Sequence, residues 1–297
     1  ADDNVAVGYQ ALTDNTTGTA NTAIGKTALA NNTTADYNTA LGYQALFTVT
    51  TGHSNTAIGK NVLVNATTGN HNTGVGTDAL ATSTTGADNT SVGYQSLQAL
   101  TTGASNTAVG RLAGNDITEG DFNTFIGRQA GEKTTTSDGN TAVGYIALQE
   151  NTTGALNTAI GQEALQKSTT ASSNVAVGYQ ALEENTTGEA NVAIGAACLD
   201  GSTTQNNNTA VGYDAAGVAA VSGLTAVGRG ALAANTTGWN TAVGYLAGNA
   251  ATTGGASVYV GAEAGLVVTT GASNTMIGHQ AGKAATTGGN NTFIGYL

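Results

Sequence analysis

The chain has 297 residues, among them 43 glycines and no proline; 40% are hydrophobic and only 9% are charged. About a quarter of the residues of a soluble domain are usually charged, so this charge content is unusual for one. Disordered chains avoid aliphatic residues, so the composition argues against disorder as well. The net charge of −11 disfavours a nucleic-acid partner, because phosphate binding needs a basic surface. No apolar run is long enough for a membrane span and no signal peptide is recognised, so we expect no direct membrane insertion by this segment.

A glycine recurs every 17 residues. The step of 17 holds from Gly8 to Gly212, two steps of 16 follow, and the step of 17 then returns up to Gly295. Eighteen repeats, called coils below, therefore fill the chain. We expect a single repeat domain over residues 1–297, as a segment of a longer fibre protein.

The columns of the repeat predict an all-β fold. Numbered from its asparagine, the coil has the consensus N-T-A-V-G-Y-Q-A-L-x-x-N-T-T-G-x-x. Position 2 is Thr or Val and position 4 is Val, Ile or Leu, which suits one face of a short strand. The glycine at position 5 predicts a corner with positive φ, and the Thr-Thr-Gly at positions 13 to 15 predicts a second turn. A 17-residue coil is too short for helix pairs and favours a parallel β-solenoid.

The two 16-residue coils lose a residue after position 12. In one of them residues 218–224 replace the Thr-Thr-Gly phrase, and in the other Trp239 directly follows Gly238. Because loops at the surface tolerate deletions better than packed segments, this part of the coil is expected to face outward.

The strand phrase resembles a known family. Asn55-Thr56-Ala57-Ile58-Gly59 and its counterparts look like the head repeat of YadA-like trimeric autotransporter adhesins, and the phrase over residues 144–154 is similar to repeats of bacterial and phage fibre proteins. The resemblance covers the whole chain, although Thr stands where the family usually has Ser and the family's coils are shorter. It implies a left-handed β-roll, a side-by-side homotrimer and an adhesive role outside the cell, on a bacterial surface or a virion.

Substitutions in different columns compensate one another. Where position 9 is Gly instead of Leu, either position 3 is bulky, as in Phe125, Tyr259 and Met276, or position 7 is Leu112 or Leu246. We therefore expect positions 3, 7 and 9 to share one space. Position 3 faces away from positions 2 and 4 along a strand, which implies a second apolar space.

These two spaces lead to an expectation for burial. Positions 4 and 8 are expected to line the coil interior, positions 3, 7 and 9 to lie at the contact between chains, and positions 10 to 17 to carry most of the exposed surface. A wider, flattened single-chain coil that holds both spaces is the alternative.

Catalytic and metal-binding clusters are not recognised. His53, His71 and His279 fall at unrelated positions, and Cys198 replaces a small residue at position 8, which is typical of an inert buried thiol. We expect no enzyme activity, no cofactor and no metal.

Position 6 is the one column that could serve recognition. It holds eight of the ten tyrosines and five of the eight cations, and seven neighbouring pairs join a Tyr to a Lys or Arg. At about 4.8 Å spacing such pairs could form cation–π contacts of roughly 0.5 to 1 kcal/mol each. The column is either a stabilising ladder or a contact stripe for a host glycan or protein. The candidate residues, called the position 6 stripe below, are Tyr9, Lys26, Tyr43, Lys60, Tyr94, Arg111, Arg128, Tyr145, Tyr179, Tyr213, Arg229 and Tyr245.

The leading functional prediction is a non-catalytic structural and adhesive fibre segment that serves as spacer and attachment. The alternative is an ice-binding solenoid that uses the Thr-Thr pairs. A glycan-degrading spike would need paired carboxylates on neighbouring coils, and no column supplies them.

Overall fold

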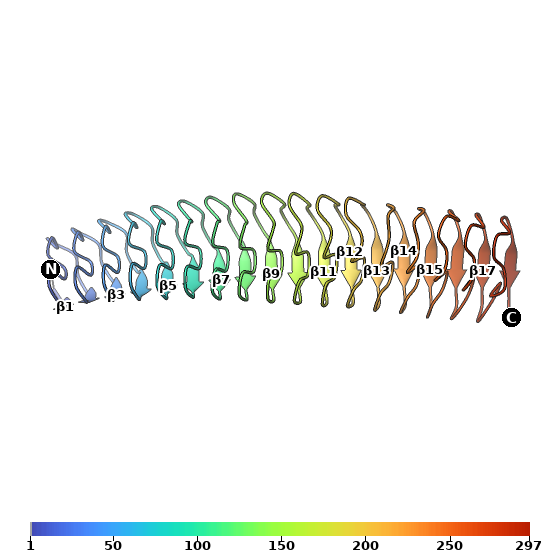
Figure 1. Ribbon diagram of the computed structural model, residues 1–297. Coiled ribbons are helices and arrows are strands. Elements are labelled where there is room, and N and C mark those ends of the chain that lie inside the picture. The colour runs from blue at the N-terminus through green and yellow to red at the C-terminus, as the bar shows by residue number, and fades with distance from the viewer. Residues whose placement is uncertain (1) are drawn as a thin grey trace. The chain divides into compact units, whose positions relative to one another are not determined.

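The computed structural model describes residues 2–297 and contains one three-residue strand in every coil (Figure 1). The predicted all-β parallel solenoid of eighteen coils is confirmed. The chain divides into two compact units, Ala1–Thr153 and Gly154–Leu297, called unit 1 and unit 2. Strands β1 to β9 belong to unit 1 and β10 to β18 to unit 2.

The strands occupy positions 2 to 4 of each coil. In unit 1 they are β1 (Val5–Val7), β2 (Thr22–Ile24), β3 (Thr39–Leu41), β4 (Thr56–Ile58), β5 (Thr73–Val75), β6 (Thr90–Val92), β7 (Thr107–Val109), β8 (Thr124–Ile126) and β9 (Thr141–Val143). In unit 2 they are β10 (Thr158–Ile160), β11 (Val175–Val177), β12 (Val192–Ile194), β13 (Thr209–Val211), β14 (Thr225–Val227), β15 (Thr241–Val243), β16 (Val258–Val260), β17 (Thr275–Ile277) and β18 (Thr292–Ile294).

Within each unit, neighbouring strands pair in parallel and without offset. Thr107 pairs with Thr124 between β7 and β8, and Thr158 pairs with Val175 between β10 and β11. Equivalent positions of successive coils therefore form columns with a spacing of about 4.8 Å. This register is what allows one side chain to contact its counterpart in the next coil.

The corner at position 5 is confirmed. These glycines have φ between 124° and 144°, and a Cβ on Gly93 would lie 2.3 Å from the carbonyl oxygen of Gly110 in the next coil. Positions 7, 9 and 17 also have positive φ, as in Gln44 (55°), Leu46 (51°) and Tyr37 (59°). The sequence did not indicate these three turns, because residues other than glycine occupy them in most coils.

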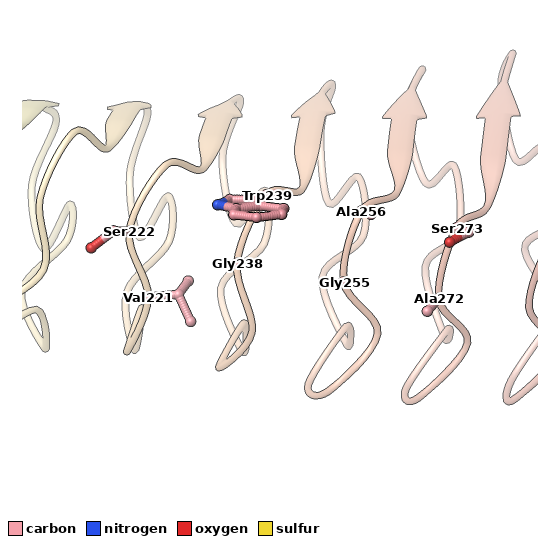
Figure 2. A pocket seen from close by; sticks show the side chains of 8 residues that line it. All are labelled: Val221, Ser222, Gly238, Trp239, Gly255, Ala256, Ala272 and Ser273. Carbon is pink, nitrogen blue, oxygen red and sulfur yellow. The ribbon is translucent and has the colours of Figure 1, made fainter.

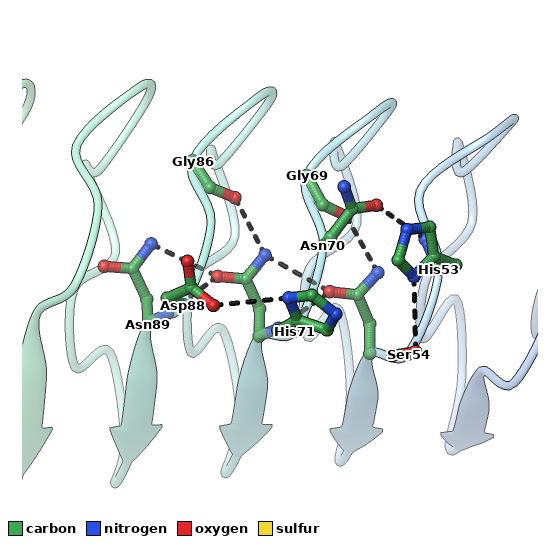
Figure 3. A network of polar contacts seen from close by, with 10 residues as sticks. His53, Ser54, Gly69, Asn70, His71, Gly86, Asp88 and Asn89 are labelled. Carbon is green, nitrogen blue, oxygen red and sulfur yellow. Dashed lines mark hydrogen bonds and ion pairs between the residues drawn. The ribbon is translucent and has the colours of Figure 1, made fainter.

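A ladder of buried asparagines at position 1 closes the coils. The Nδ2 of Asn72 donates to the carbonyl of Gly86 in its own coil at 2.8 Å, and its Oδ1 accepts from the backbone N–H of Asn89 in the next coil at 3.0 Å (Figure 3). Each side chain thus satisfies buried backbone groups in two coils. The sequence analysis used this asparagine to number the coil but assigned it no role.

The coil interior is lined by positions 3, 8, 9 and 12. Ala108, Ala113, Leu97 and Leu100 represent these positions, and all four are fully buried. The prediction of burial is therefore right for position 8, but it is wrong for position 4, where Val109 is 38% exposed. Positions 12 and 15 are buried as well, so positions 10 to 17 carry less of the surface than expected.

The assignment of positions 3 and 9 to a contact between chains is wrong. Leu29, Leu46 and Leu80 are fully buried within a single chain. The strand has two apolar faces, but their placement is the reverse of the prediction. The narrow interior holds Ala at position 3, and the β-branched residues at positions 2 and 4 face outward. Strand alternation fixes that these two sets lie on opposite faces, and the width of the coil decides which face is inside.

The prediction that a bulky residue compensates for glycine at position 9 is confirmed for position 3 and wrong for position 7. A Cβ on Gly114 would lie 2.7 Å from the ring of Phe125 in the next coil, and a Cβ on Gly248 would lie 2.6 Å from the ring of Tyr259. These two glycines are thus explained by an aromatic ring of the following coil. Leu112 and Leu246, the residues at position 7, are half-buried and do not replace the missing leucines.

Candidate binding surfaces

The position 6 stripe forms in both units. In unit 1, Lys26 Nζ lies 6.0 Å from the ring centre of Tyr9 and 5.9 Å from that of Tyr43. In unit 2, the guanidinium of Arg229 lies 5.7 Å from Tyr213 and 5.9 Å from Tyr245. These contacts and two more, Arg111 with Tyr94 at 5.9 Å and Arg128 with Tyr145 at 5.5 Å, account for six of the seven predicted pairs.

All members of the stripe are exposed at the surface. Most of the tyrosine rings therefore contact a cation of a neighbouring coil and are also accessible to solvent. Tyr179 differs from the others because its neighbours in the column are Gln162 and Ala196, and it is 48% exposed. The stripe thus contains tyrosines with a cation partner and one tyrosine without a cation beside it.

The sequence analysis missed an outward aliphatic surface at position 4. Its side chains are mostly 36 to 44% exposed in the inner coils of both units, and the Thr or Val residues at position 2 beside them are mostly half-buried. The clearest members are Ile24, Leu41, Ile58, Val92, Val109 and Ile126 in unit 1 and Ile160, Ile194, Val243 and Ile277 in unit 2. We call this surface the position 4 column.

The Thr-Thr pairs do not form the regular hydroxyl array expected of them. The Oγ1 of Thr101, at position 13, donates to the carbonyl of Thr118 in the next coil at 2.9 Å, and Thr16 donates to Thr33 in the same way. These hydroxyls hold neighbouring coils together. In most coils only the second threonine of the pair, such as Thr102, is exposed.

The histidines lie at the surface. His53 and His71 contact each other edge to face at 5.2 Å, and His71 Nδ1 lies 3.3 Å from Asp88 Oδ1 (Figure 3). His279 stacks on Tyr296 at 5.2 Å. Among residues 2–297, no three His, Cys, Asp or Glu side chains come together as a metal site, and no helix could cross a membrane.

Cys198 is buried inside its coil, where its Sγ donates to the carbonyl of Ala210 at 3.3 Å. Burial raises the pKa of this thiol to about 12. Thiolate is the nucleophilic form, so Cys198 does not supply a nucleophile at neutral pH.

Acidic side chains on positions 7 and 10 of unit 2 have shifted pKa values. Burial raises the pKa of Asp200 and of Asp214, and their mutual repulsion raises that of Asp200 further. The pKa of Glu263 is lowered instead, because Lys283 and Gln280 donate hydrogen bonds to it.

Comparisons with protein-family models and with curated proteins find no match to this chain. The fold and the surfaces define its class: it is a parallel β-solenoid repeat protein. The resemblance of its strand phrase to YadA-like adhesin heads and phage fibres stays a prediction.

Proposed function

We propose that this chain is a non-catalytic segment of an extracellular fibre, which assembles as a parallel homotrimer through the position 4 column. The observation that carries the proposal is the outward column of Val, Ile and Leu residues, most of them about two-fifths exposed in the inner coils. Contiguous apolar surface of this kind is rare on monomers and is typical of protein contacts.

The column is large enough to stabilise an assembly. Full burial of a Val or Ile side chain is worth roughly 1.5 to 3 kcal/mol, so covering the exposed two-fifths of one contributes about 1 kcal/mol. Most of the coils in each unit repeat this contribution, and the coils with a less exposed valine add a smaller one. Because the strands are in register, a second chain with the same spacing can match the column coil by coil. The resemblance to trimeric adhesin heads supports three chains rather than two, and cyclic symmetry covers every copy of the surface.

The location follows from the same resemblance: the segment serves on a bacterial surface or a virion, as a spacer and for attachment to a receptor or surface. A solenoid extends by adding coils without a change in its cross-section, which suits a spacer. Equivalent sites on three chains also suit attachment by many weak contacts. The position 6 stripe is the candidate contact for a host glycan or protein.

Sedimentation of the purified chain tests the assembly. We expect a trimer for the parent chain and monomers for the variant Val92→Lys/Ile126→Lys, because charges at these two positions would be buried without partners. The matched control is Thr102→Lys/Thr136→Lys, which adds the same charges to the same two coils at exposed position 14 and leaves the trimer intact. A folded, monomeric parent chain would contradict the proposal.

The outward surface also supports a second candidate, an ice-binding solenoid. The ordered array is formed by Thr at position 2 and Val or Ile at position 4, such as Thr107 and Val109, rather than by the Thr-Thr pairs. It presents methyl and hydroxyl groups at one spacing along each unit. This function requires the surface to stay uncovered, so a monomer that inhibits ice growth and loses the inhibition in Val92→Lys/Ile126→Lys would favour it over the fibre.

A further inference from the structure

Unit 2 has a surface groove of about 590 Å³ at a place where the repeat is irregular (Figure 2). It runs along positions 15 to 17 of four successive coils. Its lining residues are Val221, Ser222, Gly238, Trp239, Gly255, Ala256, Ala272 and Ser273.

The groove lies beside the two shortened coils. In the first of them, Asn208 Nδ2 donates to the carbonyl of Val221, thirteen residues ahead, at 2.8 Å, whereas in the next full coil Asn240 Nδ2 donates to the carbonyl of Gly254, fourteen residues ahead, at 2.8 Å. The first coil therefore lacks a residue before position 15, where other coils have the Thr-Thr-Gly turn, and in the second Trp239 directly follows Gly238. Trp239 then falls at position 17, next to the start of β15.

Packing does not explain a tryptophan at this place. Trp239 is 77% exposed and has φ of 64°, a left-handed conformation that costs an L-residue roughly 1 to 2 kcal/mol. In several other coils of unit 2 the same position holds small residues such as Ala190 and Ala256, although Leu156 is also large and exposed there. An exposed indole adds little burial in return, so the structure offers no stabilising reason for it.

The indole is held in place rather than free in solvent. A Cβ on Gly223, one coil earlier, would lie 3.2 Å from Trp239 Cδ1 and 3.5 Å from Nε1. The pyrrole edge of the ring therefore lies against Gly223, where a methyl group would shift it by a few tenths of an ångström and a longer side chain would take its place. Nε1 has no hydrogen-bond acceptor among residues 2–297, so it is a free donor at the edge of the groove.

Two hydroxyls lie at the ends of the groove, with Trp239 between them (Figure 2). Ser222 Oγ accepts a hydrogen bond from Asn206 N–H at 2.9 Å, which leaves its own proton to donate, and Ser273 Oγ has no partner in the described part of the chain. The serines belong to coils three steps apart, about 14 Å at the usual strand spacing. No lining residue carries a charge.

From this arrangement we infer that the groove binds a neutral oligosaccharide, with one pyranose ring stacked on Trp239. The negative π face of an indole attracts the polarised C–H groups of a sugar face, while the indole N–H and the serine hydroxyls bind its hydroxyls. The uncharged lining disfavours anionic sugars, and nucleotides would need cations for their phosphates. The inference rests on the proposed adhesive function and gives it a ligand class.

Trp239 is the only tryptophan of the chain, so its fluorescence reports on this groove alone. The intact chain is titrated with maltotetraose, cellotetraose, mannotetraose and galactotetraose. We expect a saturable change in the emission of Trp239 with at least one of them. Trp239→Ala, tested by calorimetry with that sugar, weakens binding by roughly tenfold or more.

Two further variants make the test specific. Gly223→Leu, a residue that position 17 accepts at Leu156, places a side chain where the ring lies and weakens binding while Trp239 is retained. Phe122→Ala removes an exposed aromatic from position 17 of unit 1 and leaves the emission change intact. The absence of a saturable response to all four sugars would overturn the inference. So would an emission shift that depends on protein concentration without sugar, since a second copy would then cover the indole.

Sedimentation of the same samples separates this inference from the proposed function. A trimer that binds none of the sugars overturns only the glycan site. A monomer that binds one of them through Trp239 overturns only the assembly.

Discussion

The ring of Phe125 occupies the space that a side chain on Gly131 would need. A Cβ built on Gly131 would lie 2.4 Å from Phe125 Cε1, and Phe125 is fully buried. In most coils the same space is shared by Ala at position 3 and Leu at position 9. Protein interiors are close-packed, so a larger side chain at position 3 requires a smaller one at position 9, and the total side-chain volume stays similar.

This exchange predicts a strong coupling between the two residues. Phe125→Ala leaves a cavity and should lower the free energy of unfolding by about 3 to 5 kcal/mol. Gly131→Leu in the presence of Phe125 overfills the coil and should cost about 1 to 3 kcal/mol or more. The double variant recovers the ordinary Ala and Leu pair and should cost clearly less than the sum.

Urea unfolding of the four proteins in a double-mutant cycle measures the coupling. Leu29 and Leu46 have φ of 49° and 51° at position 9, so the backbone at Gly131, with φ of 60°, accepts leucine. Strictly additive losses would show that the two residues do not share a space.

The asparagine ladder predicts a cost at Asn106. Its Nδ2 donates to Gly120 O at 2.8 Å, and its Oδ1 accepts from the backbone N–H of Asn123 at 2.9 Å. Asn106→Ala leaves both buried backbone groups without a partner and should cost roughly 2 to 4 kcal/mol. Amide hydrogen exchange should accelerate first in the coils next to Asn106. The control Thr102→Ala changes an exposed side chain and should leave exchange unaltered; equal effects of the two variants would argue against the ladder.

Much of the fold was predictable because the same sequence pattern recurs in eighteen coils. The period and the corner follow from a glycine column that never varies, such as Gly93, and the strand at positions 2 to 4 follows from the β-branched residues on either side of position 3. The inward face was not predictable in the same way. Alternation separates Ala108 from Val109, but hydrophobicity favours the larger residue for the interior, whereas the narrow coil accepts only the smaller one.

The candidate surfaces were predictable to a different extent. The contact of Lys26 with Tyr9 follows from two adjacent coils and a zero-offset register, so the sequence was sufficient. The groove at Trp239 depends on a residue lost from the same coil and on a glycine one coil earlier. The sequence showed the deletion and the tryptophan, but not that they meet Gly223.

Cys198 should be unreactive in the folded chain. With its pKa raised to about 12 by burial, only roughly one thiol in ten thousand is ionised at pH 8. A chromogenic disulfide reagent should therefore modify the native protein very slowly and react with one equivalent of thiol after denaturation. Cys198→Ala, which introduces the most common residue at position 8, serves as the blank. Rapid labelling of the native protein would contradict the buried placement.

Unit 2 should become more stable as the pH falls from 7 to about 4.5. Burial raises the pKa of Asp200, Asp214 and Glu183 in the folded state. Each raised pKa adds stability that is complete below the unfolded value and is lost as the pH rises through the folded one. Glu263 acts in the opposite direction, since its lowered pKa removes stability only below its usual value of 4.5.

Thermal unfolding between pH 7 and pH 4.5 measures this effect. The melting temperature should rise over that interval, and Asp200→Asn/Asp214→Asn should show a smaller rise, because two of the responsible carboxyls are gone. A steady fall of the melting temperature over the same interval would show that other ionised pairs dominate.

The last prediction separates the two roles of the position 6 stripe, using two tyrosines of unit 2. Tyr213 contacts Arg229 at 5.7 Å, whereas Tyr179 stands between Gln162 and Ala196 without a cation beside it. If the stripe stabilises the fold, Tyr213→Ala should lower the free energy of unfolding by about 0.5 to 1 kcal/mol. Arg229→Ala should lower it by about twice as much, because the contact with Tyr245 is lost as well. Tyr179→Ala should change it little. If the stripe binds a receptor, Tyr179→Ala and Tyr213→Ala should weaken attachment of the intact assembly to target cells to a similar, partial degree. Urea unfolding measures the first role and cell attachment the second. Loss of stability that is confined to the cation-paired tyrosine, with attachment unchanged in both variants, would leave the stripe as a stabilising ladder alone.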